Sequence, residues 1–475
     1  MSIAFGTEGW RAIIAEEFTV ENVCKVTQAI AEHFLATRPR STRAPTMAVG
    51  HDTRFLSDYF ARAVCEVLAA NGIRSYLTDR PVPTCAISRY IVTHRLTGGI
   101  MITASHNPPV YNGIKVKEGF GGSATPETVA SIEQRIGQHA IKRRSFARAA
   151  QHGFIHQADL LPAFVAGLRA CVDLAAIRRS RFKILVDPMH GTANGLIEQL
   201  LRGGRCRVAT LHANPDPLFG GHAPEPIPIH LGELIRTVKR DRWDIGLATD
   251  GDADRIGVIA PDGTFLNPGQ ILCLLLEHLI ASRRWRGAVV KTVSNTSMID
   301  RLAQGLGLRL LEVPVGFKHI AKLMLEDEVL IGGEESGGIG IRGYLPERDG
   351  ILIGLLVLEA MAMQGRGVLS ILRRLEQRFG RWFYARRDLT VAQAQVTNLF
   401  ERLRQHPPTR LAGIPVVEVK TLDGIKLVGR DESWLLFRRS GTEPIIRVYA
   451  ESPVARRLNR LLDFGVRLIK AVKID

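Results

Sequence analysis

The sequence predicts an α/β protein that ends in a smaller α+β unit. Short apolar runs bounded by glycine and proline alternate with helical patterns as far as residue 376, which is typical of βαβ units with a mostly parallel sheet. The pattern starts again near residues 150 and 265 and changes character after 376. A chain of 475 residues has room for three or four domains of about 150 residues.

The first block begins with a loop-like stretch at Phe5–Arg11 and continues with alternating elements. Apolar residues at helical spacing predict helices over 18–34, 57–71 and 126–137, and a strand that starts at Met47. The basic run 142–148 has no apolar periodicity, so we expect a linker there and a domain boundary near 150.

The second and third blocks repeat this pattern, which suggests a structural repeat. We expect strands at 182–187, 205–210, 243–249 and 287–293, and helices at 160–172, 194–202, 269–281, 297–306, 351–363 and 369–378. In the last hundred residues, 434–438 and 445–451 are expected to be strands of the α+β unit.

The composition is that of an ordinary globular protein, with 45% hydrophobic and 23% charged residues. A net charge of +16 raises the possibility of nucleic-acid binding. The basic residues form short separated clusters, for example 142–144 and 283–286, with no zinc-finger or RNA-binding signature. An anionic small substrate accounts for the charge as well, and we expect no nucleic-acid partner.

The cysteines and the apolar runs indicate the compartment. The six cysteines show no metal-ligand or redox-motif spacing. No signal-peptide pattern is found at the start. The longest uncharged apolar run, 351–358, is shorter than the roughly 20 residues of a membrane span. We therefore expect a cytoplasmic protein without a membrane partner.

Ser105 lies in the stretch around which the chain is organised. Gly98–Ile102 has the pattern of a buried strand, and Asn107-Pro108-Pro109 cannot continue it. Ser105 should therefore lie on a loop at a strand end, with His106 beside it and Lys115 ten residues later. These residues could form a nucleophile that carries an acyl or phosphoryl group. A turn whose polar side chains satisfy its own backbone is the plainer alternative.

Asp250, Asp252 and Asp254 follow a predicted strand at every second position. Three carboxylates make a hard, oxygen-rich site suited to Mg²⁺. A calcium EF-hand loop is excluded because Arg255 stands where glycine is needed and Pro261 where glutamate is needed. A solvated acidic turn remains the alternative.

Two further loops could bind a ligand. Glu334 and Ser336 lie in a glycine-framed acidic loop, and such side chains can hold vicinal sugar hydroxyls. The overlapping G-x-G-x-x-G pattern at 338–343 is not followed by a helix, so we reject a dinucleotide site. The tight segment 438–447, with hydroxyls, free amides and arginines, could bind an anion.

The stretches TASHNPP (103–109) and YNGIK (111–115) together resemble the active-site loop of the α-D-phosphohexomutases, the family of phosphoglucomutase and phosphomannomutase. The resemblance implies that Ser105 is carried as phosphoserine and that Lys115 transfers a proton, with His106 adjacent. The opening FGTEGWR resembles the family's FGT-x-G-x-R, which makes Arg11 a candidate for steadying the phosphoryl group, although Ala12 replaces the usual glycine.

Other motifs follow in the family's order. DGDADR resembles the loop in which one Mg²⁺ bridges three aspartates and the phosphoserine, here Asp250, Asp252, Asp254 and Ser105, with Arg255 beside them. GFK implies a substrate-side role for Lys318, and GEESG the same for Glu334 and Ser336. The segment RRSGTEPIIR resembles the family's phosphate loop, with Arg439 in place of proline, and implies phosphate binding by Arg438, Ser440, Gly441, Thr442 and Arg447.

The resemblance implies four domains around a central active-site cleft: three related α/β domains (1–150, 151–264 and 265–376) and a smaller α+β domain (377–475). It implies interconversion of hexose 1-phosphate and hexose 6-phosphate through a phosphoserine enzyme, with a hexose 1,6-bisphosphate as intermediate and activator. The Glu-Glu-Ser form of the sugar loop favours glucose phosphates over mannose or glucosamine phosphates. We expect a monomer or a homodimer.

Electrostatic repulsion explains why a metal is needed. Phosphoserine and a substrate phosphate each carry a charge of about −2, so at roughly 6 Å and an effective dielectric of about 20 they repel by about 11 kcal/mol. A divalent cation and arginines such as Arg255 can offset this. A phosphatase, or a non-catalytic nucleic-acid-binding protein on a mutase fold, is the alternative function.

Overall fold

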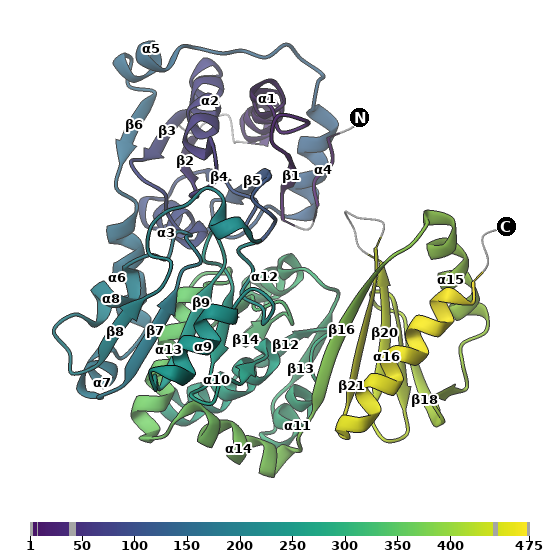
Figure 1. The fold of residues 1–475 in the computed structure, drawn as a ribbon. Coiled ribbons are helices and arrows are strands. Elements are labelled where there is room, and N and C mark those ends of the chain that lie inside the picture. The colour runs from purple at the N-terminus through teal and green to yellow at the C-terminus, as the bar shows by residue number, and fades with distance from the viewer. Residues whose placement is uncertain (1–2, 7, 38–43, 440–444, 473–475) are drawn as a thin grey trace.

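The computed structural model describes residues 3–6, 8–37, 44–439 and 445–472. Within them the chain forms four sheets with their helices (Figure 1), and the fourth sheet stands apart with its own helices on the right of the view. The predicted class is confirmed: three mixed α/β units precede a smaller antiparallel unit.

The first sheet has the strand order β1-β5-β4-β2-β3-β6. Strands β4, β2, β3 and β6 run parallel to one another. Strand β5 pairs antiparallel with β4, and β1 pairs antiparallel with β5. The elements are β1 (Trp10–Ile13), α1 (Val20–Thr37), β2 (Thr46–His51), α2 (Ser57–Ala70), β3 (Arg74–Thr78), α3 (Thr84–His94), β4 (Gly98–Ile102), β5 (Tyr111–Glu118), α4 (Pro126–Arg135), α5 (Phe146–Gln151) and β6 (Ile155–Ala158).

Two local expectations for this unit were wrong. The loop-like opening runs into β1, which the sequence hides because its strand character comes from pairing with the distant β5. Helix α5 begins inside the expected linker, and its Ala149 is fully buried. The boundary near 150 stays a prediction; β6, which lies just beyond it, pairs with β3 of the first sheet.

The second sheet has the order β11-β10-β9-β7-β8, with β9, β7 and β8 parallel. Its β11 lies just beyond the boundary expected at 264. The elements are α6 (Leu161–Cys171), α7 (Leu174–Arg179), β7 (Lys183–Asp187), α8 (Leu196–Leu201), β8 (Arg207–Thr210), the 3₁₀ turn η1 (Phe219–Gly221), α9 (Gly232–Arg240), β9 (Ile245–Thr249), β10 (Ile256–Ile259) and β11 (Phe265–Leu266).

The third sheet has the order β13-β12-β14-β15, and the fourth is antiparallel in the order β16-β21-β20-β19-β18-β17. The third unit contains α10 (Pro268–Arg283), β12 (Ala288–Thr292), α11 (Met298–Gly305), β13 (Leu310–Val313), α12 (Phe317–Glu326), β14 (Val329–Gly333), β15 (Ile339–Ile341), α13 (Gly350–Gln364) and α14 (Val368–Phe379). The fourth contains β16 (Phe383–Thr390), α15 (Gln393–Gln405), β17 (Arg410–Leu411), β18 (Ile414–Lys420), β19 (Ile425–Gly429), β20 (Trp434–Arg439), β21 (Ile445–Ser452) and α16 (Ala455–Lys470).

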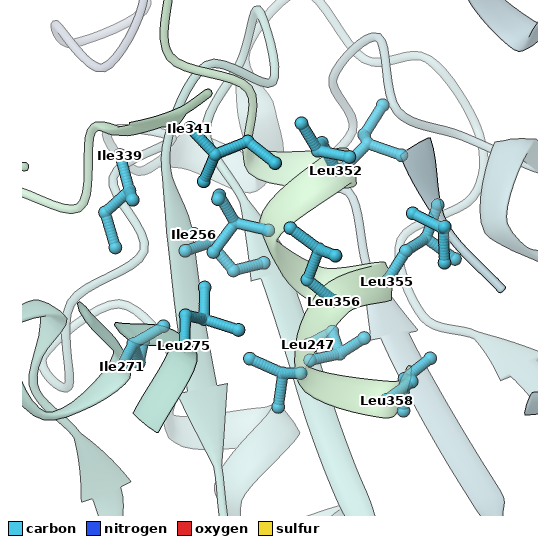
Figure 2. Close-up of a cluster of buried hydrophobic side chains, with 14 of the residues drawn as sticks. Leu247, Ile256, Ile271, Leu275, Ile339, Ile341, Leu352, Leu355, Leu356 and Leu358 are labelled. Atoms are coloured by element: carbon cyan, nitrogen blue, oxygen red, sulfur yellow. The ribbon is translucent and has the colours of Figure 1, made fainter. Parts of the chain in front are cut away.

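Helix α13 joins the second and third units into one core. It is apolar on all sides and almost wholly buried, as expected of a helix surrounded by protein. Figure 2 shows its Leu352, Leu355, Leu356 and Leu358 beside side chains of the second sheet (Leu247, Ile256), of α10 (Ile271, Leu275) and of β15 (Ile339, Ile341). The loops at the ends of these elements are therefore held in fixed relative positions.

No helix in the described ranges has, taken alone, the length and apolarity needed to cross a bilayer. Helices α13 and α14 meet that criterion only as a pair bent by 83°.

Candidate active site

Ser105 lies just after β4, at the carboxyl end of a strand, as predicted. Its side chain is fully buried and its φ is +52°, a backbone conformation that is unfavourable for residues other than glycine. The Ser105 amide donates to Thr103 Oγ1 (2.8 Å), and Ser105 Oγ donates to Asp250 Oδ2 (2.7 Å). The hydroxyl is thus aimed from the first unit into the second.

Arg54 clamps the loop that carries Ser105. Its guanidinium donates to the carbonyl oxygens of Ser105 (2.7 Å), Asn107 (2.7 Å), Pro108 (2.8 Å) and Tyr111 (2.9 Å). Arg54 is 3% exposed. Four bonds from one rigid planar group fix the path of the loop.

Asp52 in turn holds Arg54. Its carboxylate lies 3.2 Å from Arg54 Nε and accepts hydrogen bonds from Ser57 Oγ (2.8 Å) and Thr103 Oγ1 (2.6 Å). Neither Asp52 nor Arg54 was predicted as a site residue. Their His-Asp-Thr-Arg segment starts at His51, the last residue of β2, and this strand end, next to that of Ser105, was the available signal.

Two glycines allow the loops to meet. A Cβ on Gly113 would lie 2.6 Å from the carbonyl oxygen of Thr103, and one on Gly251 would lie 2.8 Å from that of Ser105. Any larger residue would push the serine loop away from β5 or from the aspartate loop.

The aspartates form a compact acidic cluster after β9. Asp250, Asp252 and Asp254 are buried, and each offers an oxygen within 4.8 Å of the others. Burial, and repulsion from Asp254 and Asp252, raise the pKa of Asp250 well above its usual range. Asp252 Oδ1 and Asp254 Oδ1 are buried and accept no hydrogen bond from the residues that the structure describes. Unsatisfied hard oxygens of this kind fit a divalent cation such as Mg²⁺.

Lys115 reaches this cluster from β5. Its Nζ lies 2.6 Å from Asp252 Oδ2, 2.7 Å from Asp254 Oδ2 and 4.0 Å from Glu8 Oε2. Burial by itself would lower the pKa of Lys115, but the three carboxylates outweigh it and raise that pKa. The ammonium form therefore prevails at this position.

Arg348 is a central cation of the site that the sequence analysis did not identify. Its Nη2 donates to Asp254 Oδ2 (2.7 Å) and to Glu8, and its Nη1 donates to Glu334 Oε2 (2.9 Å). One buried guanidinium thus links the first three units. The only signal was the charged triplet Glu347-Arg348-Asp349 directly before the apolar helix α13.

The proposed sugar loop brings Glu334 to the same place. Burial raises the pKa of Glu334 to about 7, against the opposing effect of Arg348. Its neighbour Glu335 points elsewhere, because it accepts hydrogen bonds from Ser294 Oγ (2.6 Å) and Thr292 Oγ1 (3.1 Å). Ser336 is half-buried in the turn. Glu334 therefore faces the cleft, whereas Glu335 holds the loop in place.

Lys318 is the second residue of helix α12. With Glu8 and Lys115 it lines a cavity of about 170 Å³. The structure therefore places Lys318 beside the acidic centre.

Arg11, His106 and Arg255 surround the serine. Arg11 Nη1 donates to Asn107 Oδ1 (2.6 Å), and the Arg255 amide donates to Asp250 Oδ1 (3.0 Å). His106 Nδ1 lies 3.4 Å from Ser105 Oγ. Burial, together with Arg255 and Arg11, lowers the pKa of His106 well below its usual range, so its ring is neutral at pH 7.

The fourth unit contributes two arginines. Arg438 on β20 and Arg447 on β21 are direct cross-strand partners. Arg438 Nε donates to Asp423 Oδ2 (2.8 Å), and the same oxygen accepts from the Val315 amide (2.9 Å) just before Lys318. The expected phosphate-loop residues Ser440, Gly441 and Thr442 lie outside the described residues.

Comparison with known proteins agrees with this assembly. The four domains of the phosphoglucomutase/phosphomannomutase family match the chain in order: the alpha/beta/alpha domains I, II and III over residues 2–142, 162–263 and 267–379, and the C-terminal domain over 393–467. The chain belongs to the phosphoglucomutase/phosphomannomutase family. The family consists of mutases, so the protein is an enzyme of the isomerase class and a phosphohexomutase.

Several individual members resemble the chain over nearly its whole length. A phosphoglucomutase/phosphomannomutase from Thermococcus kodakarensis is 30% identical over 472 residues, which cover 99% of each chain. A phosphoglucomutase from Komagataeibacter xylinus is 30% identical, covering 95% of this chain and 87% of that one. A crystal structure assigned as a phosphomannomutase from Thermus thermophilus superposes with a TM-score of 0.87 at 36% identity, covering 99% of this chain and 100% of that one.

The clamp on the serine loop gives a testable prediction for this phosphohexomutase. Arg54→Lys removes the planar group and leaves one ammonium for four carbonyl oxygens, so the loop should shift. We expect kcat to fall about 100-fold, since a displacement near 1 Å can cost that much. Steady-state kinetics and a thermal unfolding curve measure the effect. Arg62→Lys, at an exposed arginine of the same unit, is the matched control, and equal kcat values for the two variants would contradict the clamp.

Proposed function

We propose that the protein interconverts hexose 1-phosphate and hexose 6-phosphate through phosphorylated Ser105. The observation that carries the proposal is the hydrogen bond from Ser105 Oγ to Asp250 Oδ2 (2.7 Å), inside the aspartate cluster that Lys115 also contacts. A nucleophilic hydroxyl, acidic metal ligands and a proton-carrying amine meet there although they come from two different units. Phosphoryl transfer needs this combination.

In the proposed reaction the phosphoryl group moves from Ser105 Oγ to a free hydroxyl of the sugar phosphate. The bond between phosphorus and Ser105 Oγ breaks, and a bond to the sugar oxygen forms. Lys115 Nζ donates a proton to the departing Ser105 Oγ and takes up the proton of the sugar hydroxyl, so the proton balance closes. The resulting bisphosphate turns over in the cleft and returns its other phosphoryl group to Ser105.

The sugar is held from the third unit and its distal phosphate from the fourth. Glu334 and Ser336 would bind sugar hydroxyls, with Lys318 alongside, and Arg348 keeps Glu334 oriented at 2.9 Å. Arg438 and Arg447 would bind the phosphate that is not reacting, together with Ser440, Gly441 and Thr442. Arg447 Nε is buried without a hydrogen-bond partner among the described residues and lies 3.8 Å from Asp388 Oδ2, so this donor remains available to an anionic ligand.

A single Mg²⁺ is part of the proposal, held by Asp250, Asp252, Asp254 and a phosphate oxygen on Ser105. When bound, the cation would withdraw charge from the transferring phosphoryl group. A hexose 1,6-bisphosphate would serve as activator because it can phosphorylate an unmodified Ser105. A cytoplasmic location belongs to the same proposal, and the six free cysteines are compatible with it.

Substitution of the nucleophile tests the reaction. Ser105→Ala should lower the conversion of glucose 1-phosphate by at least about 1,000-fold, in the presence of Mg²⁺ and a trace of bisphosphate, because no covalent carrier remains. Ser370→Ala, at an exposed serine of α14, should keep full activity. Retained mutase activity in Ser105→Ala would contradict the proposal. Release of inorganic phosphate without isomer formation by the wild-type enzyme would indicate a phosphatase.

Metal dependence gives a second prediction. Treatment with a chelator should abolish turnover, and added Mg²⁺ should restore it. Asp252→Asn should weaken Mg²⁺ binding by at least about 10-fold, since it removes one anionic ligand, and calorimetric titration measures this. Asp262→Asn, at an exposed aspartate outside the cluster, is the control. Full activity in chelator would exclude the metal site.

The preferred sugar gives a third prediction. Relatives of this chain are named for glucose, mannose and glucosamine phosphates, so the family does not decide between them. We propose glucose, on the basis of the Glu-Glu-Ser form of the sugar loop, with phosphomannomutase or phosphoglucosamine mutase as the alternatives. The kcat/KM for glucose 1-phosphate should exceed those for mannose 1-phosphate and glucosamine 1-phosphate by at least about 10-fold. A higher value for either competitor would reassign the substrate.

A further inference from the structure

Exposed cations gather at the amino-terminal edge of the second sheet, opposite the active site. Strands β9, β7 and β8 are adjacent and parallel, so the segments that lead into them lie side by side. Six exposed cations of these segments define what we call the basic edge: Arg181, Lys183, Arg202, Arg205, Arg207 and Arg242. In Figure 1, α7 and β8 of this region lie at the lower left of the molecule.

Backbone contacts fix the segments of the basic edge against one another. Lys183 and Arg207 are register partners on β7 and β8. The Arg205 amide donates to the carbonyl oxygen of Arg178 (2.7 Å), and the Arg207 amide donates to that of Phe182 (2.9 Å). Clusters that are separate in the sequence thus become one surface.

None of the six cations forms an ion pair with a residue in the described part of the chain. Nearby Asp241 is engaged by Arg240 at 2.8 Å, and Asp244 accepts from the Lys183 amide at 2.7 Å. Helices α7, α8 and α9 end here, and a helix C-terminus favours cations. Arg202 caps α8, and the last turns of α7 and α9 contain Arg178, Arg179, Lys239 and Arg240. The other five cations of the basic edge lie outside these turns, so they add to the charge that the helix dipoles favour.

The third sheet provides an internal comparison. At the corresponding ends of its strands, Arg309 pairs with Asp327, and Arg342 lies 3.6 Å from Glu328. Arg284 and Arg286, which lead into β12, are exposed and form no ion pair with a described residue. The edge of the third sheet therefore pairs part of its cations within the chain, whereas none of the six cations of the basic edge is paired in the part of the chain that the structure describes, and this excess favours an external anion.

The chemistry of the basic edge defines the partner. Five of its six cations are arginines, which bind phosphate oxygens in a bidentate manner. None of the large apolar side chains exposed in the described chain belongs to these segments. We propose that the basic edge binds the phosphate headgroups of an anionic lipid bilayer, electrostatically and reversibly, without inserting into it. Peripheral binding of this kind departs from the expectation of no membrane partner, which was based on the lack of a run long enough to span a bilayer, because it needs no such span.

When the basic edge lies on a bilayer, the active-site loops stay accessible to substrate. The five residues of β9 separate the basic edge from Asp250 by about 16 Å, at roughly 3.3 Å per residue. A bilayer at one end of the strands would thus face away from the catalytic loops at the other. Duplex nucleic acid fits less well, because in these described segments no helix or ribbon projects into a groove and no exposed aromatic side chain can stack on bases.

Vesicle sedimentation of the full-length protein tests the proposal. Wild type should bind vesicles of phosphatidylcholine mixed with phosphatidylglycerol, should not bind phosphatidylcholine alone, and should dissociate as salt is added. The variant Arg181→Gln/Arg205→Gln/Arg242→Gln should partition about 100-fold less strongly, from the typical contribution of a basic residue near an anionic surface. Turnover of hexose phosphate in solution should be unchanged.

The matched control removes the same number of charges from exposed arginines of α15 and α16: Arg402→Gln/Arg404→Gln/Arg460→Gln. It should bind vesicles as wild type does. Equal losses in both triple variants would mean that only the overall charge matters, and would overturn the assignment. Absence of vesicle binding by wild type would also overturn it, as would binding to labelled duplex DNA alone. Sedimentation does not depend on turnover, so these outcomes are separate from the test of the mutase reaction.

Discussion

The site depends on the compensation of buried negative charge. Five buried carboxylates, on Glu8, Asp250, Asp252, Asp254 and Glu334, converge where the first three units meet. Among the described side chains, Lys115 and Arg348 are the cations within hydrogen-bond distance of them. A buried charge without compensation costs several kcal/mol. The units therefore cannot pack correctly unless these ion pairs form, and domain packing and site assembly become one event.

The compensation is incomplete at the aspartates. Neither Lys115 nor Arg348 forms an ion pair with Asp250, whose pKa is raised by burial and by the neighbouring aspartates. One oxygen each of Asp252 and Asp254 remains without a hydrogen bond in the described chain. A divalent cation would supply the missing positive charge and the missing partners together. Ser105 is placed to share such a cation because Arg54 and Thr103 hold it in a left-handed conformation. The strain of this conformation is offset by the four carbonyl contacts of Arg54, which makes the serine loop rigid before any ligand arrives.

Sequence reasoning located the loops but not the contacts between them. The strand-end positions of Ser105 and Asp250 follow from local patterns, and so do long helices such as α1, α10 and α13, whereas short strands such as β3, β6 and β13 were not predicted. Arg54, Arg348 and Glu8 were missed because their partners are distant in sequence: Arg348 lies 94 residues from Asp254 and 340 from Glu8. Nothing in the Glu-Glu pair shows that Glu335 turns toward Ser294 while Glu334 meets Arg348. Strand β1 was missed for the same reason, since its pairing partner is β5.

The topology of the second unit also influences where its charged residues lie. In a βα unit the helices point their N-termini toward the carboxyl ends of the strands and their C-termini toward the amino ends, so the dipoles favour anions at one edge and cations at the other. The edge that carries Ser105 and the aspartates has the polarity that suits an anion such as a phosphate group. The opposite edge follows the second tendency. The third unit cancels part of this charge with Asp327 and Glu328 but leaves Arg284 and Arg286 exposed without an ion pair among the described residues, whereas the six cations of the basic edge are all unpaired there. Because pairing is available to this architecture, the number of unpaired cations in the second unit reflects its surface sequence and not the fold alone.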